Sequence, residues 1–143
     1  MRLLSLLLLL LAPELAAQDH DEAVSWRTYA SEHSARVRVF ASDDARRPRT
    51  VVVDDRASNG TAVTDDAQFV ADVIGRELGF DPVAATFVFR FTPAAFVEDA
   101  SERGKTLLLK ATFRRTSTGA LGAPDWRVIS SDALEDLTDR AMR

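Results

Sequence analysis

Apolar and polar residues alternate along several short segments of the chain, a pattern that predicts strands with one buried face. The clearest case is residues 35–41, where Val37 and Val39 lie on one side and the arginines between them on the other. The other segments predicted as strands span residues 24–30, 50–54, 84–91, 105–115 and 126–129. A short, charged connection joins residues 35–41 to residues 50–54, which predicts an antiparallel hairpin.

Two further segments have apolar residues at helical spacing. Residues 65–78 are preceded by Thr64, a good N-cap residue, and followed by Gly79, a residue type that often ends helices. Residues 130–143 form the second predicted helix. The segment from Pro93 to residue 103 follows a threonine and precedes a glycine, so it is predicted to be either a short helix or a structured loop.

The predicted order of elements is β-β-α-β-(α)-β-β-α, which defines an α+β domain rather than a doubly wound one. We therefore expect a mostly antiparallel sheet of about four to six strands, with two or three helices packed on one face. That face would bury the phenylalanines and leucines of the strands. The opposite face would then be open to water or to a partner.

The N-terminus has a composition unlike the rest of the chain. Met1 and Arg2 form a short positive region, and residues 3–12 are a leucine-rich run broken only by Ser5. Residues 13–17 are polar or small apart from Pro13 and Leu15. This order is typical of a secretory signal peptide, here with cleavage between Ala17 and Gln18. The apolar run is shorter than the roughly 20 residues that a membrane-spanning helix needs. An uncleaved anchor is the alternative interpretation.

Cleavage would leave a polar leader at residues 18–23, expected to be flexible, and a single α+β domain at residues 24–143. We expect no transmembrane segment after cleavage and a location in the periplasm or outside the cell. The chain has no cysteine, which excludes disulfides, thiolate metal ligands and thiolate nucleophiles. Arginine supplies sixteen of the eighteen basic residues, which we interpret as the codon bias of a GC-rich bacterial genome.

Two motifs resemble ligand-binding loops but lack essential residues. Residues 55–66 have the length of a calcium loop, yet Ala57 occupies a ligand position and cannot ligate. The Gly104-Lys105-Thr106 sequence looks like the end of a phosphate-binding loop, but the first glycine of that loop is missing and a strand is predicted to follow. The sequence therefore predicts no metal site and no cofactor.

No complete catalytic motif is present. His20 and His33 are the chain's two histidines, and neither lies in a metalloprotease spacing or near a nucleophile elbow. We therefore predict no catalytic residues and a non-catalytic binding module. The alternative is a small envelope hydrolase with a carboxylate-based site, to which His33 could contribute. A structural subunit recruited through its aromatic-rich segments is a third hypothesis.

The binding hypothesis depends on a basic face of the sheet. If the apolar strand faces are buried, six cations project from the opposite side: Arg36, Arg38, Arg90, Lys110, Arg114 and Arg127. Such a face could hold an anionic partner or an acidic protein surface in the envelope. The net charge of −4 disfavours nucleic acid as the partner, because nucleic-acid-binding domains are usually basic. The competing interpretation is a solvated face whose arginines pair with neighbouring acids.

Overall fold

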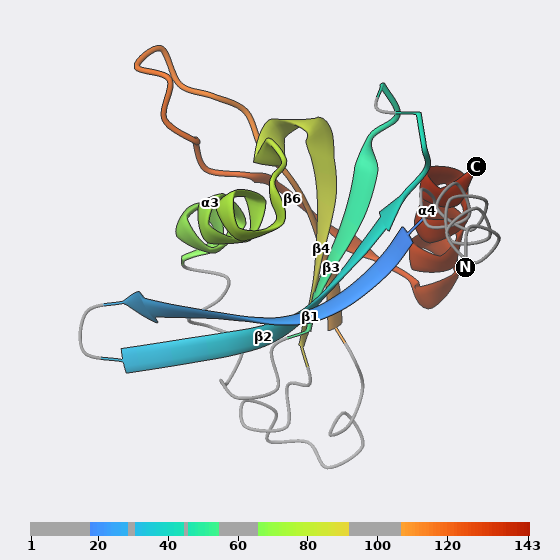
Figure 1. Ribbon diagram of the computed structural model, residues 1–143, viewed down its shortest axis with the longest axis horizontal. Helices are drawn as coiled ribbons and strands as arrows, with labels where there is room; N and C mark the ends of the chain where they lie inside the picture. Colours follow the sequence, from blue (N-terminus) through green and yellow to red (C-terminus); the bar gives the residue numbers. More distant parts are fainter. Residues whose placement is uncertain (1–17, 29–30, 45, 55–65, 92–106) are drawn as a thin grey trace, which may run out of the picture.

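The computed structural model describes residues 18–28, 31–44, 46–54, 66–91 and 107–143. They form an α+β domain built on one six-stranded sheet, with strand order β1-β2-β3-β4-β5-β6 (Figure 1). The elements in chain order are β1 (Gln18–Thr28), β2 (Ser31–Ala41), β3 (Arg49–Asp54), α3 (Ala67–Leu78), the short 3₁₀ helix η2 (Pro82–Ala84), β4 (Ala85–Phe91), β5 (Leu107–Thr112), β6 (Asp125–Ile129) and α4 (Ser131–Met142). The predicted segment at residues 93–103 lies outside the described residues.

The sheet is mostly antiparallel, which confirms the predicted fold class. Every neighbouring pair of strands is antiparallel except β3 and β4, which run parallel. The predicted hairpin is present as β2 and β3. The parallel pair follows from the chain order, because α3 connects β3 to β4 and returns the chain to the same end of the sheet.

The segment expected to be a flexible leader belongs to the sheet. Residues 18–23 form the first half of β1, and their backbone pairs with residues 36–41 of β2. The polar composition of this segment gives no alternating pattern from which a strand could be predicted. Backbone pairing does not require apolar side chains, so a polar edge strand can form where a neighbouring strand offers hydrogen-bonding groups.

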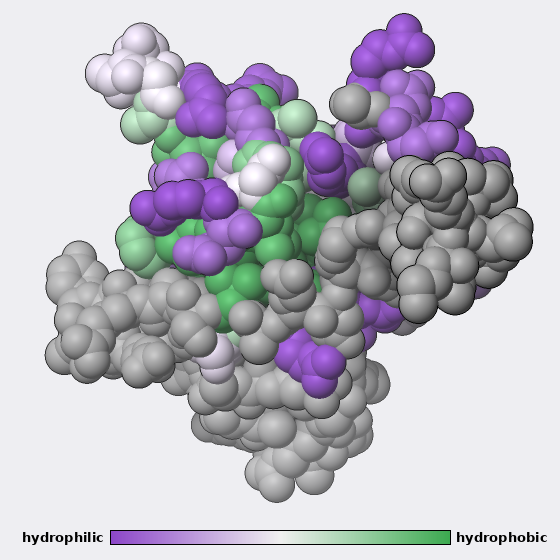
Figure 2. Space-filling model, viewed as in Figure 1, coloured by the Kyte–Doolittle hydropathy of each residue, from purple (hydrophilic) through white to green (hydrophobic). Residues whose placement is uncertain are grey.

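The larger core lies between α3 and one face of the sheet. Phe87, Phe89 and Phe113 are fully buried there, and the rings of Phe87 and Phe113 meet edge to face with centroids 5.3 Å apart. The helix contributes Val70 and Ile74, which are also fully buried. Figure 2 shows hydrophilic residues on the outer side of α3 and hydrophobic residues between this helix and the strands. The strand faces predicted to be apolar are therefore the ones that α3 covers.

The second helix packs on the opposite face of the sheet. Leu134 of α4 forms a small separate core with buried residues of three central strands, namely Val52, Val88 and Leu108. The Thr50 hydroxyl also donates a hydrogen bond to the Leu137 carbonyl oxygen at 3.3 Å. The strand pattern predicts both helices on one face, whereas α3 and α4 lie on opposite sides (Figure 1). The physical reason is that three apolar side chains interrupt the basic face, and α4 removes them from water.

The C-terminus of α3 and the N-terminus of α4 follow local capping rules. Gly79 ends α3 in the left-handed conformation, with φ of 78°, as the sequence predicts. The predicted start of this helix is wrong, because α3 begins at Ala67, two residues after the predicted start, with Asp66 as its N-cap. The Asp66 side chain makes no capping hydrogen bond. The Ser130 hydroxyl caps α4 by accepting a hydrogen bond from the Ala133 backbone N–H at 3.1 Å. Neither of these described helices is long and apolar enough to cross a membrane.

Gly75, inside α3, is expected to resist replacement by alanine. A Cβ at this position would lie 2.6 Å from the Phe80 carbonyl oxygen and 2.9 Å from Cγ of Pro82. Replacing a helical glycine with alanine usually raises the free energy of unfolding by about 0.5–1 kcal/mol. Here the clash with backbone outweighs that gain, and we expect Gly75→Ala to lower the free energy of unfolding by about 1–3 kcal/mol.

Urea unfolding of Gly75→Ala, beside Asp72→Ala at an exposed position of the same helix, measures this effect. The control variant has the same alanine propensity without the clash, so its free energy of unfolding should stay within about 0.5 kcal/mol of the parent. A Gly75→Ala variant as stable as the parent would show that the end of α3 moves away at no cost.

Candidate functional site

The strand register places five of the six predicted cations on the face of the sheet that carries α4. Arg38, Lys110 and Arg127 belong to one row across the sheet, with Val52 and Val88 between them in the register. In the adjacent row, Asp54 is the cross-strand neighbour of both Arg36 and Arg90. Arg114 follows the end of β5. The alternation of the strands therefore identified a real basic face, but not how α4 lies on it.

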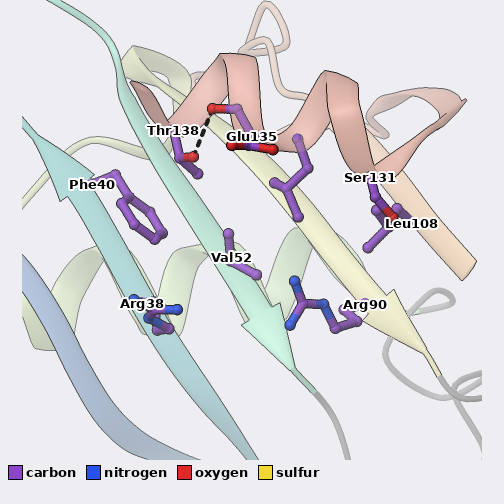
Figure 3. A pocket seen from close by; sticks show the side chains of 9 residues that line it. Arg38, Phe40, Val52, Arg90, Leu108, Ser131, Glu135 and Thr138 are labelled. Atoms are coloured by element: carbon purple, nitrogen blue, oxygen red, sulfur yellow. Dashed lines mark hydrogen bonds between the residues drawn. The ribbon is translucent and has the colours of Figure 1, made fainter. Parts of the chain in front are cut away.

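One part of this face forms a recess against α4, which we call the α4 recess. It has a volume of about 420 Å³. Its sheet side is lined by Arg38, Phe40, Val52, Arg90 and Leu108, and its helix side by Ser131, Leu134, Glu135 and Thr138. Figure 3 shows Arg38 and Arg90 on either side of β3, with the side chain of Val52 between them and α4 opposite. Two cations thus share a recess with apolar side chains.

The two arginines of the α4 recess have different surroundings. The guanidinium carbon of Arg38 lies 5.0 Å from the centroid of the Phe40 ring, a cation–π contact. Arg36, Arg38 and Asp54 each have at least one further interaction partner. Arg90 is half-buried, and none of the described acidic residues forms an ion pair with it. Arg90 is therefore a cation in a partly desolvated position whose hydrogen-bond donors can serve a ligand.

The other part of the basic face lies along β5 and β6, away from α4. Here a second recess of about 670 Å³, the β5–β6 recess, is lined by Lys110, Thr112, Arg114, Asp125, Trp126 and Arg127. Arg114 and Asp125 are both largely exposed and lie 3.8 Å apart, a distance and exposure at which an ion pair contributes little. Three cations and one carboxylate thus give this surface a net positive charge.

Sequence reasoning missed the residues that α4 contributes to the site. Ser131, Glu135 and Thr138 lie at spacings of four and three residues, so they share one side of the helix. That side lines the α4 recess. The signal was present in the sequence, but it identifies a site only when α4 is known to lie against the basic face.

The remaining candidates lie mostly outside the described residues. Residues 55–65 of the calcium-like loop, residues 104–106 and the side chains of His20 and His33 belong to that part. Asp54, a carboxylate at the end of β3, lies among the arginines of the basic face. Within the described ranges, no three histidine, aspartate or glutamate side chains gather in a way that could hold a metal ion.

Comparison of the chain with protein-family models, with curated proteins and with solved structures finds no match. Functional reasoning therefore starts from the geometry and charge of the basic face.

Proposed function

We propose that this protein is an exported, non-catalytic binding domain that holds an acidic protein surface on its β5–β6 recess. One observation carries the proposal: Lys110, Arg114 and Arg127 converge on an open part of the sheet that α4 leaves uncovered. The signal-peptide pattern at residues 1–17 supports export to the envelope or beyond.

The edge of the sheet supports a protein as the partner. β6 is the last strand in the described sheet, so its outer backbone groups are available to a further strand. Val128 on this strand is 71% exposed, and it lies with Trp126 on the face opposite Arg127, where the Trp126 ring packs against Phe89 with centroids 5.5 Å apart. Arginine is enriched at protein interfaces, and an exposed edge can pair with an extended segment of a partner.

The charge distribution supports a local acidic surface rather than a long polyanion or a membrane. The whole chain has a net charge of −4, so an extended anion would meet repulsion beyond the recess. Three cations around one edge strand match a partner segment with a few carboxylates. Such contacts act over about one Debye length, roughly 8 Å at physiological salt.

The test is a cross-linking capture from envelope fractions with the chain starting at Gln18 as bait. Changing Lys110, Arg114 and Arg127 together to glutamate is expected to reduce capture of the partner at least about tenfold, because attraction becomes repulsion. Raising the salt concentration should also reduce capture of the partner by the parent bait, because salt screens the attraction between opposite charges.

The matched control changes Arg46, Arg47 and Arg76 to glutamate. These three residues are exposed, lie outside both recesses and give the same change in net charge. We expect this variant to capture the partner as the parent does. Equal capture by all three baits, or equal loss in both variants, would show that the β5–β6 recess is not the contact surface.

A further inference from the structure

We propose that the α4 recess is a second, separate binding site, for a small amphipathic anion. Its ligand would carry one carboxylate, sulfonate or phosphate group joined to an apolar body. This site does not depend on the proposed function, because it lies between α4 and β2–β5 and shares no lining residue with the β5–β6 recess. The inference rests on the charge, the apolar lining and the size of the recess.

The sheet side supplies the positive charge. Arg90 is half-buried and forms no ion pair with any described acid, and Arg38 lines the same recess from β2. Both guanidinium groups belong to the wall that faces α4 (Figure 3). A guanidinium can donate two parallel hydrogen bonds to a carboxylate or a phosphate, and these charge-assisted bonds are stronger where water is partly excluded.

Apolar side chains separate the two arginines and continue toward the helix. Val52, Leu108 and Leu134 are each less than 10% exposed yet line the recess. The half-buried Phe40 ring extends this surface beside Arg38. A volume of about 420 Å³ falls in the usual range of small-molecule sites. A simple inorganic anion would leave this apolar surface unused, which favours a ligand with an apolar body.

The helix side limits the ligand to a single anionic group. Glu135 contributes a carboxylate to the recess opposite the two arginines. The Thr138 hydroxyl already donates to the Glu135 carbonyl oxygen at 2.9 Å, so its oxygen remains as an acceptor. A second anionic group on this side would be repelled by the Glu135 carboxylate. A hydroxyl or amide N–H of the ligand could instead donate a hydrogen bond to that carboxylate.

A matched pair of fluorescent probes tests the site: 8-anilinonaphthalene-1-sulfonate, and N-phenyl-1-naphthylamine, which lacks the sulfonate. We expect the sulfonate probe to bind with one-to-one stoichiometry in a calorimetric titration. Arg90→Gln is expected to weaken its binding at least about tenfold while changing the affinity of the neutral probe less than about twofold. Glu135→Gln should strengthen binding of the sulfonate probe about two- to fivefold.

Two further variants localise the probe. Arg127→Gln removes an equal charge from the β5–β6 recess and should leave both affinities unchanged. Ser131→Trp, at an exposed position on the helix wall, fills the α4 recess and should abolish binding of both probes. Equal weakening by Arg90→Gln and Arg127→Gln, no binding by the folded parent, or unchanged binding in Ser131→Trp would overturn the proposal. None of these outcomes bears on capture through the β5–β6 recess.

Discussion

Replacing Phe87 with alanine is expected to lower the free energy of unfolding by about 3–5 kcal/mol, a large part of the 5–15 kcal/mol typical of a domain. The Phe87 side chain is fully buried at the centre of the larger core. Its ring lies 6.1 Å from Phe89, 6.3 Å from Phe80 and 5.3 Å from Phe113, measured between centroids. Truncation would leave a cavity between β4, β5 and the segment after α3, and dense packing would prevent its complete collapse.

Guanidinium chloride unfolding followed by far-UV circular dichroism measures this loss. Phe69→Ala is the matched control, because Phe69 belongs to α3 and is 44% exposed. The same chemical change there should lower the free energy of unfolding by less than about 1 kcal/mol. Comparable losses at the two positions would show that the ring cluster is not the centre of the core.

The faces of the central strands and the C-terminal end of α3 follow from the sequence. Alternation in residues 35–41 separates Val37 and Val39, both buried, from arginines that lie on the other face. Gly79 ends α3 because its φ of 78° is accessible to glycine at little cost. Strand faces follow from alternation with a period of two, and this helix end follows from one glycine. Both depend only on residues close together in the chain, so they can be predicted from one sequence.

The position of α4 was not predictable from the same pattern. Val52, Val88 and Leu108 alternate with the buried set, so each one alone is only an apolar residue between the cations of the basic face. That these three side chains lie together as one apolar patch can be recognised only when the register of the strands is known. The helix that covers this patch carries Leu134 and Leu137 on one side. Its contact with the strands joins segments that are far apart in the chain, so local sequence patterns do not reveal it.

The candidate site was also predictable only in part, because it too depends on where α4 lies. The alternation predicts that all six basic residues share a face. The register places five of them on the face that carries α4, and Arg114 lies beyond the end of β5. Five of the six line a recess: Arg38 and Arg90 line the α4 recess, and the other three line the β5–β6 recess, whereas Arg36 lines neither. This division depends on the helix, as does the contribution of Glu135. The polar half of β1 was missed for a related reason, since backbone pairing with β2 leaves no signal in side-chain hydropathy.

Leu134→Ala is expected to lower the free energy of unfolding by about 2–5 kcal/mol. Leu134 is the described residue of α4 that is buried in the small core, 7% exposed against Val52, Val88 and Leu108. The Thr50–Leu137 hydrogen bond alone would stabilise the helix on the sheet by only about 0.5–1.5 kcal/mol. Removing the Leu134 side chain therefore costs more of the stability of α4 on the sheet than losing this hydrogen bond would.

Leu134→Met, which keeps the volume, should cost less than about 1.5 kcal/mol, and Leu137→Ala, at a half-buried position, should fall between the two. Urea unfolding of the three variants measures their losses in free energy of unfolding and so tests this order. A loss below about 1 kcal/mol for Leu134→Ala would mean that α4 does not pack on the basic face in solution. In that case the wall of the α4 recess would be absent, and the six cations would form the open face that the strand pattern alone predicts.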